Sequence, residues 1–254
     1  MRPKNKLTLI GSGWLGMAIA KQLCHTYSIT ATTTTKSKLS NTLDIKMSLF
    51  DICHYLPLVE INTSDILLVA IPPKKTFTDY EASIKNFIKT LSNTDMHIIF
   101  ISSTSVYSKI AGTYDENSLI EGSLSRCENH FLTLNNPITR LRPAGLFGGT
   151  RISGKMFAGK EVSLGQNSVN HIHQIDIVNI IEKIIDQKIT GVYNLVSPKH
   201  PTKQAVYLAN AKFFDFNVPL FLKDEKPFKR VIDGDKIVRR LNYDFVFSDP
   251  EAFR

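Results

Sequence analysis

The sequence predicts an α/β protein built on a doubly wound parallel sheet, and three observations support this fold class. A glycine-rich turn lies between an apolar strand and an amphipathic helix near the N-terminus. Short β-rich runs then alternate with helical patterns, as they do when helices cover both faces of a parallel sheet. Two of the runs, 66–71 and 98–101, are apolar throughout, which is typical of strands buried on both faces.

Hydrophobic periodicity and turn residues give each element its expected bounds. The first strand, Lys6–Ile10, leads into a helix over Trp14–His25. Pro72 ends the strand at Asp65–Ile71, because proline has no N–H group to continue a ladder. Further strands are expected at Ser28–Thr33, Ile45–Ser48, Met96–Ser102, Ile138–Leu141 and Gly191–Leu195. Further helices are expected at Ile52–Glu60, Tyr80–Leu91, Gly122–Leu134, Gln174–Ile185 and Thr202–Phe213.

The glycine-rich turn has the spacing Gly11-x-Gly13-x-x-Gly16, which is typical of a Rossmann dinucleotide site. In this motif the first glycine permits a tight turn, the second lets backbone approach a pyrophosphate, and the third packs helix on strand. Free N–H groups at the helix start favour the phosphates. The alternative is an ordinary glycine turn in an α/β protein. We expect a dinucleotide to contact the loop residues Gly11, Ser12, Gly13, Trp14, Leu15 and Gly16.

The pattern becomes irregular after Gly148, where several glycines interrupt the periodicity. We therefore predict a Rossmann domain over residues 1–148 and a C-terminal region over residues 149–254. The C-terminal region is expected to form a small α/β cap for the substrate, with the helix and strand of residues 174–195 returning to the Rossmann body.

Composition narrows the functional classes. The chain has 254 residues, 43% hydrophobic and 21% charged, which is ordinary for a globular protein. Its net charge of +8 is diffuse and accompanies no nucleic-acid motif, so we expect no nucleic-acid partner. No apolar run approaches the ~20 residues of a membrane helix, and we expect no membrane association. The three cysteines lack paired spacing, and the start reads directly into a strand, so we expect reduced thiols, no signal peptide and a cytoplasmic location.

Four segments, in this order, resemble the extended branch of the short-chain dehydrogenase/reductase superfamily, which contains sugar-nucleotide epimerases and dehydratases. Residues 101–107 (ISSTSVY) resemble its serine-bearing strand end, and residues 141–148 (LRPAGLFG) resemble its sixth strand and substrate loop. Residues 170–176 (NHIHQID) resemble its turn into a helix, and residues 191–195 (GVYNL) resemble the strand after it. The resemblance extends to about Arg240 and implies an NAD(P)-binding oxidoreductase or epimerase-like protein.

The chain also departs from that family. The family's catalytic pair is Tyr-x-x-x-Lys, yet none of the eight tyrosines has a lysine four residues later, and residues 120–128 contain no tyrosine. The glycine spacing differs from the Gly-x-x-Gly-x-x-Gly of extended members. This combination resembles atypical members, which keep the cofactor fold and lose the standard acid/base pair.

The end of the second strand bears on the choice of cofactor. NAD sites of this kind usually carry an acidic residue there to bind the ribose, and residues 30–38 contain none. Hydroxyl groups and lysines instead suit a 2′-phosphate, so we expect NADP rather than NAD; a solvated polar turn is the alternative. The candidate residues are Thr34, Thr35, Lys36 and Lys38 for the phosphate and Ala70, Ile71 and Pro72 for the adenosine side.

Candidates for catalysis follow from the resemblance. Ser103 occupies the position from which the family's hydroxyl residue binds the substrate oxygen. Tyr107, in a loop expected near the nicotinamide, is the predicted proton donor, although a tyrosine of pKa near 10 needs a cation nearby. Arg126 and His130, one helical turn apart, are weaker candidates for the same chemistry. The alternatives are a packing role for Tyr107 and surface positions for Arg126 and His130.

Two further groups of residues are candidate ligand sites. Arg142 and Arg151 flank the expected substrate loop and are the candidates for binding an anionic group of the substrate; solvated loop positions are the alternative. His171 and His173 are two residues apart in an extended segment, which places them on opposite faces, so we expect no metal. Asp176 is expected to cap the helix that follows.

The predicted function is hydride transfer between NADP(H) and a carbinol or carbonyl substrate that is nucleotide-linked or otherwise anionic. The alternative is a non-catalytic redox sensor that binds NADP(H), which the absent Tyr-x-x-x-Lys pair favours. An epimerase that retains NAD is a third hypothesis. A homodimer formed through two helices, as in many family members, is a further expectation.

Overall fold

The computed structural model describes residues 4–39, 44–53, 60–73, 79–223 and 226–253. The chain divides into two compact units that alternate along the sequence. The first comprises Met1–Val106, Ile120–Leu141 and Ile181–Val192. The second comprises Tyr107–Leu119, Arg142–Ile180 and Tyr193–Arg254. The predicted boundary at residue 148 stays a prediction.

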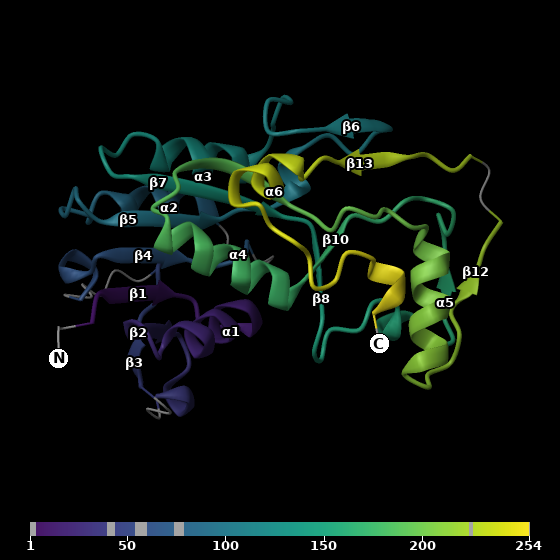
Figure 1. The fold of residues 1–254 in the computed structure, drawn as a ribbon, viewed down its shortest axis with the longest axis horizontal. Coiled ribbons are helices and arrows are strands. Elements are labelled where there is room, and N and C mark those ends of the chain that lie inside the picture. The colour runs from purple at the N-terminus through teal and green to yellow at the C-terminus, as the bar shows by residue number, and fades with distance from the viewer. Residues whose placement is uncertain (1–3, 40–43, 54–59, 74–78, 224–225, 254) are drawn as a thin grey trace. The chain divides into compact units, whose positions relative to one another are not determined.

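The first unit is organised around a seven-stranded sheet with the order β11-β7-β5-β4-β1-β2-β3. Figure 1 labels the strands from β7 to β3 in that order. From β7 to β3, each strand pairs in parallel with its neighbour. The strands are β1 (Lys6–Ile10), β2 (Ser28–Thr33), β3 (Ile45–Leu49), β4 (Ile66–Val69), β5 (His97–Ile101), β7 (Ile138–Pro143) and β11 (Gly191–Leu195).

The strand order reverses at β1. Leu7 of β1 lies opposite Ile29 of β2 on one side and opposite Ile66 of β4 on the other. The chain therefore runs outward from β1 to β3 and returns to the middle of the sheet with β4. In open α/β sheets, ligands bind outside the carboxyl ends of the strands at such a reversal. The predicted doubly wound parallel sheet is confirmed.

Helices pack on this sheet through apolar faces. α1 (Trp14–Leu23) buries Ile19 and Leu23, and α2 (Tyr80–Ile88) packs against α3 (Ser123–Phe131). Phe131 of α3 stacks on Phe100 of β5, with 4.6 Å between the ring centroids. This contact holds α3 against β5, the strand that ends just before the candidate residue Ser103.

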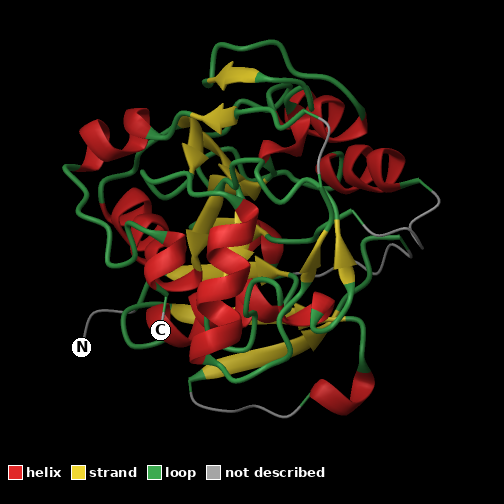
Figure 2. Cartoon of the chain, turned by 90° about the vertical axis from the view of Figure 1, so that its right-hand side faces the viewer, coloured by secondary structure: helices red, strands yellow, loops and turns green. Residues whose placement is uncertain are grey.

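The second unit contains short parallel strand pairs joined by longer loops, drawn in green in Figure 2. The pairs are β6 (Gly112–Tyr114) with β13 (Arg230–Ile232), β8 (Gly145–Phe147) with β10 (His171–His173), and β9 (Glu161–Val162) with β12 (Leu220–Phe221). Its helices are α5 (Lys203–Phe213) and α6 (Asp235–Leu241), while α4 (Gln174–Asp186) contributes to both units. Short 3-10 turns occur at Lys36–Lys38, Ile61–Thr63, Thr104–Val106, Lys155–Phe157 and Pro250–Ala252.

The bounds of several elements differ from their predictions. Strands β1, β2 and β11 have the predicted bounds, but α1 ends at Leu23 instead of His25, and α3 ends at Phe131 instead of Leu134. Helix ends fray into turns that the hydrophobic pattern alone does not mark. The predicted helix at Ile52–Glu60 lies largely outside the described residues. Within the described residues, no helix combines the length and apolarity that would cross a bilayer.

Asp176 does not have its predicted role as a helix cap. Its carboxylate is fully buried and accepts hydrogen bonds from the Tyr243 hydroxyl group at 2.8 Å and from the backbone N–H groups of Val246 and Phe247 at 2.8 and 3.1 Å. The donors lie about 70 residues away in sequence, so local spacing could not reveal them. Asp176 therefore holds the C-terminal segment onto α4.

Candidate dinucleotide site

The loop between β1 and α1 has the backbone geometry that its glycines predict. Gly11 has a φ angle of +102°, which lies in a backbone region that residues other than glycine rarely adopt. A Cβ atom there would also lie 2.8 Å from the carbonyl oxygen of Ala70 at the end of β4. The first glycine is therefore required by both torsion and space.

The two other glycines have separate spatial roles. A Cβ atom on Gly16 would collide with the carbonyl oxygen of Gly11, so only glycine lets α1 approach the turn. A Cβ atom on Gly13 would meet nothing within 4 Å, which shows that this face of the loop is open. The loop therefore presents bare backbone at the point where the motif brings a pyrophosphate close.

The start of α1 is suited to an anion. Gly13 occupies the N-cap position, no side chain caps the helix, and its first turn holds no acidic residue. The exposed N–H groups and the helix dipole favour negative charge there. Leu15 is buried against the core, whereas Ser12 and Trp14 are half-buried beside the open face.

The segment after β2 carries the residues predicted for a 2′-phosphate. Thr34, Thr35, Lys36 and Lys38 are all exposed, and Lys36 and Lys38 lie in the 3-10 turn that Thr35 begins. Thr33 supports this turn, because its Oγ1 accepts a hydrogen bond of 3.2 Å from the N–H group of Thr35.

The end of β4 forms another edge of the same region. Ala70 N–H donates to Ile10 O at 2.9 Å, which extends the pairing of β4 with β1 beyond the strand itself. The carbonyl oxygen of Ile71 accepts from the Tyr80 hydroxyl group at 2.7 Å, and Pro72 is exposed. Ala70 and Ile71 are half-buried and lie at the strand reversal, as predicted for the adenosine side.

Ser103 follows β5, and its neighbour Ser102 is held by a buried charge. The Ser102 hydroxyl group donates to Glu128 Oε1 of α3 at 2.6 Å, and Arg140 Nη1 of β7 lies 3.6 Å from Glu128 Oε2. Ser103 itself is half-buried, and its Oγ accepts from the Ser105 N–H group at 3.1 Å. Sequence reasoning missed Glu128 of α3, whose partners lie just after β5 and in β7.

Tyr107 lies in the second unit and is 2% exposed. Its hydroxyl group donates to Asn194 Oδ1 at 2.8 Å and accepts from Arg142 Nη1 at 2.6 Å. Burial raises the pKa of Tyr107, while the nearby Arg142 guanidinium acts in the opposite direction. The cation beside Tyr107 is therefore Arg142, whereas sequence reasoning looked for one in Arg126.

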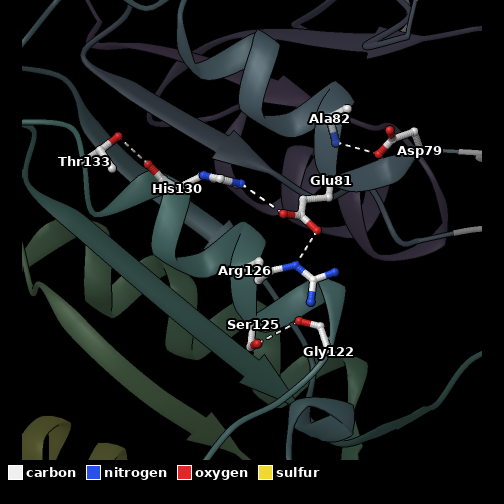
Figure 3. A network of polar contacts seen from close by, with 8 residues as sticks. All are labelled: Asp79, Glu81, Ala82, Gly122, Ser125, Arg126, His130 and Thr133. Carbon is white, nitrogen blue, oxygen red and sulfur yellow. Dashed lines mark hydrogen bonds and ion pairs between the residues drawn. The ribbon is translucent and has the colours of Figure 1, made fainter.

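Arg126 and His130 share one partner in the first unit. Figure 3 shows both side chains of α3 directed at Glu81 of α2. Arg126 Nε donates to Glu81 Oε2 at 2.6 Å, and His130 Nε2 lies 3.3 Å from Glu81 Oε1. The hydrogen bond with Arg126 is the main cause that lowers the pKa of Glu81. This cluster joins α2 to α3.

The remaining candidates differ in exposure. Arg142 is 2% exposed, whereas Arg151 is exposed and its backbone forms a tight two-way bridge with Gly148. His171 and His173 project from β10 among aromatic rings, and the pKa values of both are lowered by burial. Nowhere in the described part of the chain do three His, Cys, Asp or Glu side chains gather as a metal site.

Known proteins resemble this chain in sequence and in fold. No protein-family model matches the chain. Protein YeeZ of Escherichia coli strain K12 is 27% identical over 266 aligned positions, which cover 96% of this chain and 97% of that protein. Among solved structures, MoeE5 in complex with UDP-glucuronic acid and NAD superposes with a TM-score of 0.81 at 15% identity, covering 98% of this chain and 97% of that one.

The chain has the fold of the NAD-dependent epimerase/dehydratase-like short-chain dehydrogenase/reductases. A UDP-glucuronic acid 4-epimerase from Bacillus cereus, solved in complex with NAD, also shares it, with a TM-score of 0.78 and 16% identity. That alignment covers 97% of this chain and 95% of the epimerase. The resemblance predicted from four sequence segments is confirmed at the level of the fold.

Proposed function

We propose that the chain binds NADP(H) in its first unit and transfers hydride between it and a carbinol or carbonyl carbon of an anionic, nucleotide-linked substrate. The observation that carries this proposal is the open, uncapped glycine loop at the strand reversal beside β4. Two structural neighbours, MoeE5 and the Bacillus cereus epimerase, have NAD bound in their solved complexes.

The residues present fit a dinucleotide. Gly13 leaves room for the pyrophosphate, and the N–H groups at the start of α1 would bind its oxygens. Ala70, Ile71 and Pro72 would line the adenosine. Lys36 and Lys38 would bind a 2′-phosphate, since the segment has hydroxyl and ammonium groups and no carboxylate. This last feature is our reason for NADP(H) over the NAD of the neighbours.

The chain's own residues would orient the substrate. When bound, the nicotinamide supplies hydride transfer, and Ser103 would hold the substrate oxygen through its hydroxyl group. Arg151, which is exposed, would bind the anionic group. Tyr107 could donate a proton only after its hydroxyl group exchanges Asn194 for the substrate, because Arg142 occupies its other side. Arg142 would then serve to hold Tyr107.

A non-catalytic redox sensor is the second candidate, and the paired state of the acid/base residues favours it. Tyr107 is buried and its hydroxyl group makes two hydrogen bonds, while Arg126 and His130 both bind Glu81. In both arrangements the candidate groups are engaged by other protein side chains. A cytoplasmic location and a homodimer remain predictions in either case.

Two experiments test these proposals in sequence. Titration of purified protein with NADPH and NADH, followed by quenching of Trp14, the only tryptophan, should show saturable binding that is tighter for NADPH. No response to either nucleotide, in protein shown to be folded by circular dichroism, would overturn the proposal. Incubation of the protein with a metabolite extract and NADPH deuterated at nicotinamide C4 then separates the candidates. Transfer of deuterium to a metabolite supports the enzyme, and tight binding without transfer supports the sensor.

A further inference from the structure

Two consecutive buried threonines connect the end of β2 with two parts of the proposed site, the glycine loop and the 3-10 turn that carries Lys36 and Lys38. Thr32 is 1% exposed and Thr33 is 8% exposed. Successive side chains of a strand point to opposite faces, so these two hydroxyl groups serve different neighbours. Each binds a backbone N–H group of a different loop.

Thr32 holds the beginning of the glycine loop at two points. Its Oγ1 accepts a hydrogen bond of 3.0 Å from Gly11 N–H, and its carbonyl oxygen accepts one of 2.8 Å from Ser12 N–H. Gly11 has a positive φ and lies against Ala70, so the loop has little freedom to find another partner. Thr32 therefore sets where the loop backbone lies.

Thr33 acts on the neighbouring turn. Its Oγ1 accepts from Thr35 N–H at 3.2 Å, while its carbonyl oxygen accepts from Phe50 N–H at 3.0 Å beside β3. Thr35 begins the 3-10 turn that carries Lys36 and Lys38. The hydroxyl group of Thr33 thus fixes the direction in which the two lysines leave the sheet.

We propose that Thr32 and Thr33 are positioning residues with separate tasks. Thr32 sets the affinity for the pyrophosphate, which NADPH and NADH share. Thr33 sets the preference for NADPH, because it acts through the turn that presents Lys36 and Lys38. This inference rests on the proposed function. Both residues act through backbone groups of their neighbours, and neither is assigned a contact with the nucleotide.

Isothermal titration calorimetry with NADPH and NADH tests the division of tasks. Thr32→Val removes one acceptor without changing shape, and should raise the Kd of both nucleotides by about fivefold, the effect of one neutral hydrogen bond. Thr33→Val should raise the Kd of NADPH by about fivefold and leave that of NADH unchanged. Thr32→Ser and Thr33→Ser keep the acceptor and should restore wild-type values.

Thr8→Val is the matched control. Thr8 is a buried threonine of the adjacent strand β1, and its hydroxyl group binds Ser64, which belongs to neither loop, at 2.6 Å. Equal Kd ratios for NADPH and NADH in Thr33→Val, or a Thr32→Val variant no weaker than Thr8→Val, would overturn the inference. Absence of binding to the wild type would instead overturn the proposed function. If Thr32→Val fails to fold, Thr32→Ala compared with Thr32→Ser provides the same measurement.

Discussion

The Ser102 hydroxyl group donates a 2.6 Å hydrogen bond to the fully buried carboxylate of Glu128, which lies 26 residues later in the chain. Arg140 approaches the other carboxylate oxygen at 3.6 Å. A charge removed from water in this way is costly unless its partners remain in place. The contact joins α3 and β7 to the end of β5, directly before Ser103.

Replacement of Glu128 should therefore reduce stability strongly. Glu128→Ala removes the acidic partner of Arg140, whose side chain is only 15% exposed, and the acceptor of Ser102, so we expect the free energy of unfolding to fall by about 3 kcal/mol. Glu121→Ala, at an exposed position, should change it by less than about 0.5 kcal/mol. Urea unfolding followed by circular dichroism measures both, and similar midpoints for the two variants would contradict the prediction.

Gly13→Ala and Gly16→Ala should separate binding from folding. Gly13 has φ of −73° and open space around it, so alanine is tolerated by the fold but obstructs a pyrophosphate. We expect an unchanged melting temperature and a loss of NADPH affinity of tenfold or more, roughly 1.4 kcal/mol. Gly16→Ala should lower the melting temperature, because its Cβ atom meets the Gly11 carbonyl oxygen. Calorimetry of both variants decides whether the open face serves a ligand.

Asp176→Asn should loosen the C-terminal segment. The carboxylate accepts three hydrogen bonds, whereas an amide accepts only through its oxygen. In Asp176→Asn the NH₂ group therefore faces either the N–H group of Phe247 or the Tyr243 hydroxyl group and the N–H group of Val246. We expect a loss of about 2 kcal/mol in unfolding free energy. Hydrogen exchange should show faster exchange at the amides of Val246 and Phe247, and the same rates as the wild type would argue against the clamp. Asp215→Asn, at an exposed position, is the control.

Stability should fall in mild acid because of His171. Burial lowers its pKa to about 4 from 6.5, and its Nδ1 atom is buried with no partner among the described residues. Between these two values, the unfolded chain binds a proton that the folded protein does not. The unfolding free energy should therefore decrease as the pH falls from about 6.5 to about 4, by up to about 3 kcal/mol.

The variant His171→Gln isolates this contribution. Its unfolding free energy should decline less steeply than that of the wild type over the same pH range, as measured by urea unfolding at successive pH values. Parallel curves for the two proteins would show that the imidazole of His171 does not carry the effect. The pKa values of His97, His173 and His200 are also lowered by desolvation, but these residues remain in both proteins and cancel in the comparison.

Glu81→Gln should have little effect on stability. Its ion pair with Arg126 and its contact with His130 are partly exposed, with the Arg126 side chain 58% exposed, and such pairs contribute less than about 1 kcal/mol. The difference from the wild type should shrink further at high salt, because screening weakens exposed charges. A salt-independent loss of several kcal/mol would show that the cluster is more than a surface contact between α2 and α3.

Local sequence by itself determined the parallel sheet and the glycine loop. Apolar runs such as Ile66–Val69 identify buried strands, because a strand buried on both faces has no position for a polar side chain. The glycines identify the loop, because a Cβ atom at these positions would collide with the backbone or obstruct a ligand. The order of the strands then places the loop at the reversal between β1 and β4.

Only the tertiary structure decided the partners of the polar side chains. Several polar side chains bind groups that are 21 to 87 residues away in sequence, namely those of Glu128, Asp176, Tyr107 and Thr32. No local sequence pattern specifies a contact across such a separation. The short strands of the second unit were missed for a related reason, since pieces of two or three residues have no periodicity to detect. Their pairing depends on segments that folding brings together.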